Sequence, residues 1–166
     1  MTSVAQKQKP AFGMPGRIQS PNSKPRTIAV VGLGEGGASV ARELSKDRPP
    51  NVEVHVLAKS SANGDAVAAI KAGGGDLHRD LMNADMIFIV ARRGDDAGLA
   101  PVVSRIAHSG KHPVTALYII PADAPVPDAK SNGEDETLKT LRTAVEMLVL
   151  VSDESYVPSM ISTLAA

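Results

Sequence analysis

From residue 27 onward, short apolar stretches alternate with segments in which apolar residues recur at helical spacing. The stretches "TIAVV" (residues 27–31) and "MIFIV" (residues 86–90) are apolar throughout, which is typical of strands buried on both faces of a parallel sheet. The stretch "VEVHV" (residues 52–56) instead alternates, because Glu53 and His55 separate its valines, and this pattern predicts an edge strand. The predicted strands are residues 27–31, 52–56, 86–90, 114–120 and 147–151.

Helical patterns lie between these strands. They begin near Gly37 and after Pro101, and they also cover residues 65–71, 77–82, 136–145 and 156–164. Regular alternation of strand and helix implies right-handed crossovers and a mostly parallel sheet with helices on both faces. The pattern therefore predicts a three-layer α/β domain over residues 27–166, with the second strand beside the first and the remaining strands placed outward. The long Pro-rich loop 121–135 is predicted to be a mobile or functional segment.

Residues 1–26 differ from the rest of the chain in composition. They carry five basic residues and no acidic one, whereas the remainder has 13 basic and 18 acidic residues. Four prolines and few apolar residues predict a disordered basic arm. Two interpretations are open: an arm that docks on an acidic partner, a membrane surface or nucleic acid, and a solvated leader.

The composition excludes several kinds of site. The chain has no cysteine, which rules out disulfides, thiolate nucleophiles and thiolate-ligated metals. Of its four histidines, only His108 and His112 are four residues apart, and a Ser-Gly break separates them, so the histidines are predicted to be surface or supporting residues and no metal site is expected. Asp80 and Asp85 are likewise predicted to be surface residues. No apolar run approaches the roughly eighteen residues of a membrane-spanning helix, and we expect a cytoplasmic protein.

The turn "GLGEGG" after the first predicted strand is the clearest candidate for binding chemistry. It fits the G-x-G-x-x-G pattern through Gly32, Gly34 and Gly37, and the N–H groups at the start of the following helix would favour an anion such as a phosphate. The alternative is a tight turn that no longer binds phosphate because Glu35 fills the space. Both interpretations stay open at this point.

A Rossmann-like dinucleotide site would also need a partner for the ribose at the end of the second strand. That position offers Lys59 and Ser60, which suit a 2′-phosphate better than a free ribose. One alternative is therefore an NADP-dependent oxidoreductase or a subunit of one, although no acid or base for hydride transfer follows the turn.

Several segments, taken in order, resemble the GTP-binding half of FtsZ, the bacterial homologue of tubulin. They are "IAVVGLGEGGASVARELS", "NADMIFIVARRGDDAGLAPVVSRIA", "VTALYII" and "LKTLRTAVEMLVLVSDESYV", which together extend from about residue 26 to residue 157. The resemblance implies the fold of the tubulin nucleotide domain and a guanine nucleotide, GTP or GDP, as the ligand. The residues implied or predicted to contact it are Gly32, Gly34, Glu35, Gly36, Gly37, Arg92, Arg93, Gly94 and Asp153.

The chain also departs from that family. In place of the family's loop of glycines and threonines it has "RRGDDAGLA", with Asp95 and Asp96 where phosphate oxygens would lie. Arg92 and Arg93 are expected either to contact a partner or phosphate, or to pair with these aspartates in a solvated turn. In that family a second domain, which completes GTP hydrolysis, follows these segments, and no counterpart of it follows the last predicted helix here, so we expect no GTP hydrolysis by this chain.

These observations favour an FtsZ-like or tubulin-like binding or assembly module that has lost GTP hydrolysis over an enzyme, and the NADP-dependent oxidoreductase stays as the alternative. Bound GTP or GDP, bound NADP and no cofactor at all are each consistent with the sequence. A protein partner or self-association into an oligomer is expected.

Overall fold

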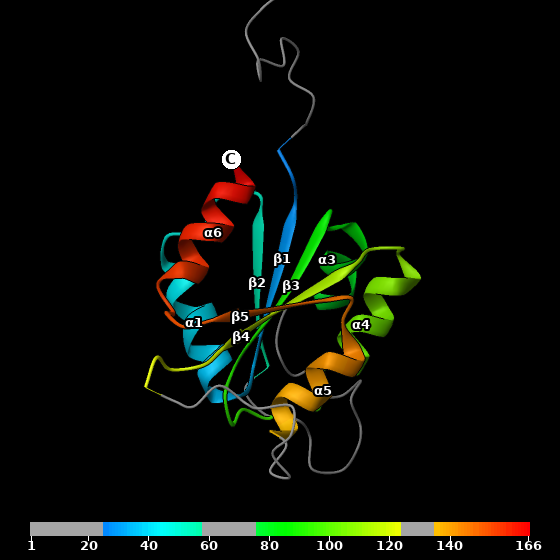
Figure 1. Cartoon of the computed structure of the whole chain (residues 1–166). Helices are drawn as coiled ribbons and strands as arrows, with labels where there is room; N and C mark the ends of the chain where they lie inside the picture. Colours follow the sequence, from blue (N-terminus) through cyan, green and yellow to red (C-terminus); the bar gives the residue numbers. More distant parts are fainter. Residues whose placement is uncertain (1–24, 58–75, 124–134) are drawn as a thin grey trace, which may run out of the picture.

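The computed structural model describes residues 25–57, 76–123 and 135–166. In these residues one five-stranded, all-parallel sheet forms in the order β2-β1-β3-β4-β5 (Figure 1). The strands are β1 (Ile28–Leu33), β2 (Val52–Leu57), β3 (Met86–Arg92), β4 (Val114–Ile119) and β5 (Met147–Val151). The predicted three-layer α/β fold and the predicted strand order are confirmed.

Five described helices cover the two faces of the sheet. They are α1 (Gly34–Lys46), α3 (Leu77–Asn83), α4 (Ala100–Ser109), α5 (Glu136–Ala144) and α6 (Tyr156–Ala165). Helices α1 and α6 pack on one face, and α3, α4 and α5 pack on the other, as Figure 1 shows. The architecture is therefore a Rossmann-like helix–sheet–helix sandwich.

The core divides in the same way. Leu81 of α3 and Leu141 of α5 join one buried cluster, and Val40 of α1 and Ile161 of α6 join the other. Every residue of β1 is buried, because this strand lies between β2 and β3 and is covered on both faces. The uninterrupted apolar sequence of β1 thus matches its central position.

Two boundaries differ from the sequence-based expectation. The helix expected near Gly37 begins at Gly34, so all the glycines of the turn after Gly32 belong to its first turn. The helix expected over residues 65–71 lies outside the described residues, as do residues 1–24 and most of the Pro-rich loop. The prediction that residues 52–56 form an edge strand is confirmed by β2. None of the helices in the described ranges is long and apolar enough to cross a membrane.

Candidate functional site

The start of α1 lies at the carboxyl edge of the sheet, where open α/β sheets place their ligands. The N-cap residue of this helix is Leu33, whose side chain forms no capping hydrogen bond. Gly34 has a φ of +69°, a conformation that other residues rarely adopt. A Cβ on Gly37 would lie 2.1 Å from the carbonyl oxygen of Val90, so glycine is needed there for α1 to pack closely on β3. The turn is thus built to bring backbone N–H groups to an open helix end.

The carboxylate of Asp95 occupies this helix end. The N–H of Gly36 donates to its Oδ1 at 2.9 Å, and the N–H of Gly37 donates to its Oδ2 at 2.8 Å. The N–H of Arg92 also donates to Oδ2, at 2.6 Å. Three backbone donors therefore converge on one carboxylate, in the place where an anionic ligand would be expected.

The turn between β3 and α4 holds Asp95 in this position. Its N–H donates to the carbonyl of Arg92 at 3.0 Å, and Gly94 allows the tight turn with a φ of +86°. From α5, the hydroxyl of the buried Thr137 donates to the carbonyl of Asp95 at 2.6 Å. The N–H of Thr137 is in turn capped by Asp135 at 3.0 Å. The starts of α1 and α5 are thus both tied to this one turn.

Glu35 does not fill the glycine-rich turn. Its side chain is exposed, and Asp95 takes the position considered for it. The interpretation that Glu35 occupies the space was wrong, because the residue after Gly34 points outward from the first turn of α1. The resemblance placed both Asp95 and Asp96 where phosphate oxygens would lie; Asp95 accepts from the glycine N–H groups, whereas Asp96 accepts from the N–H of Gly98.

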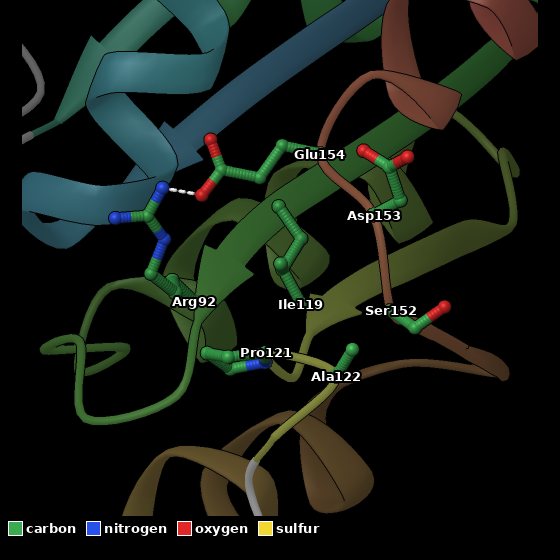
Figure 2. A pocket seen from close by; sticks show the side chains of 7 residues that line it. All are labelled: Arg92, Ile119, Pro121, Ala122, Ser152, Asp153 and Glu154. Carbon is green, nitrogen blue, oxygen red and sulfur yellow. Dashed lines mark ion pairs between the residues drawn. The ribbon is translucent and has the colours of Figure 1, made fainter.

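Arg92 contributes to a neighbouring pocket of about 620 Å³. Its guanidinium forms an ion pair with Glu154, which Figure 2 shows bridging the end of β3 and the segment after β5. The Nε of Arg92 is buried and has no hydrogen-bond partner among the described residues. The pocket is lined by Arg92, Ile119, Pro121, Ala122, Ser152, Asp153 and Glu154.

Asp153 lines this pocket, but its carboxylate forms hydrogen bonds within its own turn. Its Oδ1 accepts hydrogen bonds from the N–H of Ser155 at 2.9 Å and from the Ser155 hydroxyl at 2.8 Å. These bonds, the backbone one foremost, lower the pKa of the Asp153 carboxyl. In Figure 2 the carboxylate points away from Arg92. Asp153 therefore organises the turn before α6.

The other charged residues of "RRGDD" have partners as well, Arg93 outside the turn and Asp96 within it. The Nε of Arg93 lies 3.9 Å from Oδ2 of Asp135, and Asp96 accepts a hydrogen bond from the N–H of Gly98 at 2.9 Å. The arginines thus pair with acidic residues of other segments rather than with Asp95 and Asp96 as the solvated-turn interpretation expected. The structure brings Gly34, Gly36, Gly37 and Arg92 together around Asp95, while Gly32 packs behind them against the backbone of Gly37.

His55, expected to be a surface or supporting residue, is buried, and Asp80, expected at the surface, has a side chain that is only 15% exposed. His55 of β2 is only 7% exposed, and its Nε2 lies 3.1 Å from Oδ2 of Asp80 on α3, without the alignment of a hydrogen bond. Burial lowers the pKa of His55, and the carboxylate of Asp80 partly opposes that shift. The alternating sequence indicated that the face of β2 that carries His55 is exposed, but α3 covers this face at His55. Asp85, in contrast, is exposed as expected and accepts two hydrogen bonds from Thr27.

Within the described residues, no group of three or more histidine, aspartate or glutamate side chains is arranged to hold a metal ion. No model of a known protein family matches the sequence, and no curated protein matches it significantly.

Proposed function

We propose that this chain is a binding or assembly module with the fold of a nucleotide-binding domain, in which an internal carboxylate replaces the phosphate. The observation that carries the proposal is the set of three backbone N–H groups that bind Asp95. A phosphate at the start of α1 would need the same donors. It would also meet the negative charge of Asp95 at close range.

The packing of the turn supports this proposal. A Cβ built on Gly34 would lie 2.5 Å from the Cβ of Asp95, and one built on Gly36 would lie 2.6 Å from the Cβ of Arg92. The β3–α4 turn therefore covers the glycines at van der Waals distance. Retained binding of GTP or GDP would require this turn to move away from α1.

The resemblance to FtsZ supports an assembly role of this kind. In this resemblance, the β3–α4 turn corresponds to the loop that surrounds the phosphates in that family. Here the same turn supplies a carboxylate, that of Asp95, as the anion. Hydrolysis is not part of the proposed function. The oxidoreductase alternative has no observation in its favour, because the groove for its pyrophosphate is occupied, and Lys59 and Ser60 lie outside the described residues.

Isothermal titration of the full chain with GTP, GDP, ATP and NADPH in the presence of Mg²⁺ tests the proposal. We expect no binding by the wild type and no release of phosphate from GTP. Micromolar binding of any of these nucleotides by the wild type, or GTP turnover, would overturn it.

The variant Asp95→Ala tests the role of the carboxylate directly. It should lower the free energy of unfolding by about 1–3 kcal/mol, because it leaves buried N–H groups without an acceptor. Asp95→Asn retains an acceptor oxygen and should lose less. Glu35→Ala is the matched control, because Glu35 is an exposed acidic residue in the first turn of α1, and it should be close to the wild type. Equal stability of all three variants would contradict a structural role for Asp95.

A further inference from the structure

Strand β5 forms an apolar edge of the sheet, and no described strand pairs with its outer side. In the described part of the chain it pairs only with β4 (Figure 1). Met147 is 59% exposed and Leu150 is 52% exposed, and no residue of the strand is charged or proline. Natural edge strands are usually protected by charges, prolines, bulges or a covering segment, and β5 has none of the first two.

The two exposed residues lie on opposite faces of β5. Leu148 packs against the cluster under α3, α4 and α5, and Leu150 shares its face because side chains alternate along a strand. Val149 and Val151 pack against the cluster under α1 and α6, and Met147 therefore points to that face.

A groove runs between β5 and α6 on the face of Met147. It has a volume of about 520 Å³, and Val149, Val151, Tyr156 and Ser159 contribute to its walls. Tyr156 is 56% exposed, and α6 has no charged residue. Among the described residues that line the groove, only Asp153 is charged. The rest of the surface made by β5 and this groove, which we call the β5 edge, is uncharged, as is typical of an interface core.

We propose that the β5 edge binds the β5 edge of a second copy of this chain. In this arrangement the two β5 strands pair in antiparallel orientation about a two-fold axis, and one sheet continues through both copies. When the strands overlap fully, Met147 lies opposite Val151, Leu148 lies opposite Leu150, and Val149 lies opposite itself on the axis. The protruding Met147 of each copy is then placed beside the groove and Tyr156 of the other.

The charges at the ends of the strand are compatible with this register. Glu146 lies opposite Ser152, so no carboxylate directly faces another across the strands. The Glu146 carboxylate already accepts a hydrogen bond from the N–H of Val114 at 2.8 Å and pairs with His108. Asp153 is turned toward Ser155.

The opposite edge of the sheet fits β5 less well. Strand β2 carries Glu53, which pairs with Arg48 at 2.6 Å beside the strand. Pairing of β5 with β2 of another copy would set this charged pair against Met147 or Leu150, and it would generate an open chain of copies. The symmetric contact closes after two copies, as most homo-oligomeric interfaces do.

This inference rests on the proposed assembly function and names its partner, but it does not depend on whether the glycine-rich turn binds a nucleotide. Sedimentation velocity of the full chain over a concentration series is the first test. We expect reversible association that ends at the dimer. Leu150→Lys should weaken dimerisation by roughly tenfold or more, because it buries a charge in the apolar contact. Thr143→Lys, at an exposed position of α5, is the matched control and should dimerise like the wild type.

A crosslinking test examines the register, and the chain suits it because it has no native cysteine. In Val149→Cys, the two cysteines of a dimer lie directly opposite each other, within reach of a disulfide. In Met147→Cys, the two cysteines are offset by four positions, or about 13 Å along the strands, which is too far for a disulfide. Under mild oxidation we expect a covalent dimer from Val149→Cys and little from Met147→Cys.

Several results would overturn the inference. They are a wild type that is monomeric at all concentrations, association that continues beyond the dimer, and crosslinking of Met147→Cys at least as efficient as that of Val149→Cys. The nucleotide titrations test the internal-carboxylate proposal independently of the dimer. A dimer that also binds GTP would leave this inference standing and overturn the internal-carboxylate proposal, whereas a nucleotide-free monomer would do the reverse.

Discussion

The two edges of the sheet are built in opposite ways. Strand β2 places the charged Glu53 and the buried His55 among its valines, and Arg48 pairs with Glu53 beside it. Strand β5 consists of apolar residues alone, and two of its five side chains are more than half exposed. Charges on an edge strand discourage pairing with another chain, so β2 is protected within its own copy, whereas no charged residue of β5 itself protects that strand. The difference indicates that one edge ends the sheet and the other is available to extend it.

The protection of β2 has a cost in folding free energy. An imidazole and a carboxylate, His55 and Asp80, are drawn out of water beside this strand. Strand β5 does not bury polar groups in this way. Its apolar surface is exposed to water instead, and contact with a second copy would bury that surface. The predictions below test this contrast.

The largest expected difference concerns apolar side chains on the two strands. Val52→Ala on β2 should lower the free energy of unfolding by about 1–3 kcal/mol, because Val52 is fully buried. Met147→Ala on β5 should change the stability of the monomer by no more than about 0.5 kcal/mol. Urea denaturation at a concentration below that of dimer formation measures both. A loss at Met147 as large as that at Val52 would mean that β5 is covered within the monomer.

Tyr118 of β4 offers a second comparison, because it pairs in register with the exposed Leu150 and yet is fully buried. Its hydroxyl has no hydrogen-bond partner in the residues that the structure describes. Tyr118→Phe should therefore be neutral or stabilising by up to about 1 kcal/mol. Thermal unfolding of the two proteins decides this, and a clear destabilisation would show that the hydroxyl is bonded in solution.

The β2 edge should be sensitive to pH. Burial holds the pKa of His55 below the value of about 6.5 that it has in the unfolded chain, so the folded state binds fewer protons at this position. The contribution of neutral His55 is complete above that value and is lost as the pH falls below it. His55→Gln should flatten the dependence of the unfolding free energy on pH between 7.5 and 5.5, roughly the range that His titration spans.

His78→Gln is the control for the pH experiment, since His78 is exposed on α3. It should retain the wild-type pH dependence. If both variants flatten the curve equally, the pH dependence of the unfolding free energy does not arise from the burial of His55.

The smallest expected effect is that of the ion pair at the β2 edge. Arg48 and Glu53 are each more than two-fifths exposed, so solvent screens their attraction. Glu53→Gln should cost no more than about 0.5 kcal/mol in unfolding experiments, and it should not cause association through β2 because Arg48 keeps its charge. Sedimentation of this variant, compared with the wild type, tests the second statement.

The fold could be predicted from the sequence because it depends on apolar periodicity. The continuous apolar sequences of β1 and β3 predicted a sheet covered on both faces, and the alternation in β2 predicted an edge strand. The same reasoning did not predict that side chains of β5 are exposed, because its apolar sequence is typical of a central strand. A pattern of residue types shows which side chains avoid water, but it does not show whether the covering surface belongs to the same copy.

The candidate site was predicted only in part. The glycine-rich turn and the presence of Asp95 near it followed from the order of strands, because turns at the carboxyl edge of a parallel sheet meet there. The identity of the carboxylate that fills the turn did not follow, since Glu35 is nearer in sequence to the glycines. The choice depends on the path of the β3–α4 turn, which is fixed by contacts as distant in the chain as that of Thr137.

The contact of Asp95 with α1 also bears on how the protein responds to its surroundings. A domain that needs a bound nucleotide to satisfy a helix end gains stability in proportion to the logarithm of the nucleotide concentration. Here the anion is part of the polypeptide, at a fixed and very high effective concentration. The folded population of such a protein would not follow the supply of nucleotides in the cell, and its assembly could respond to the amount of the protein itself.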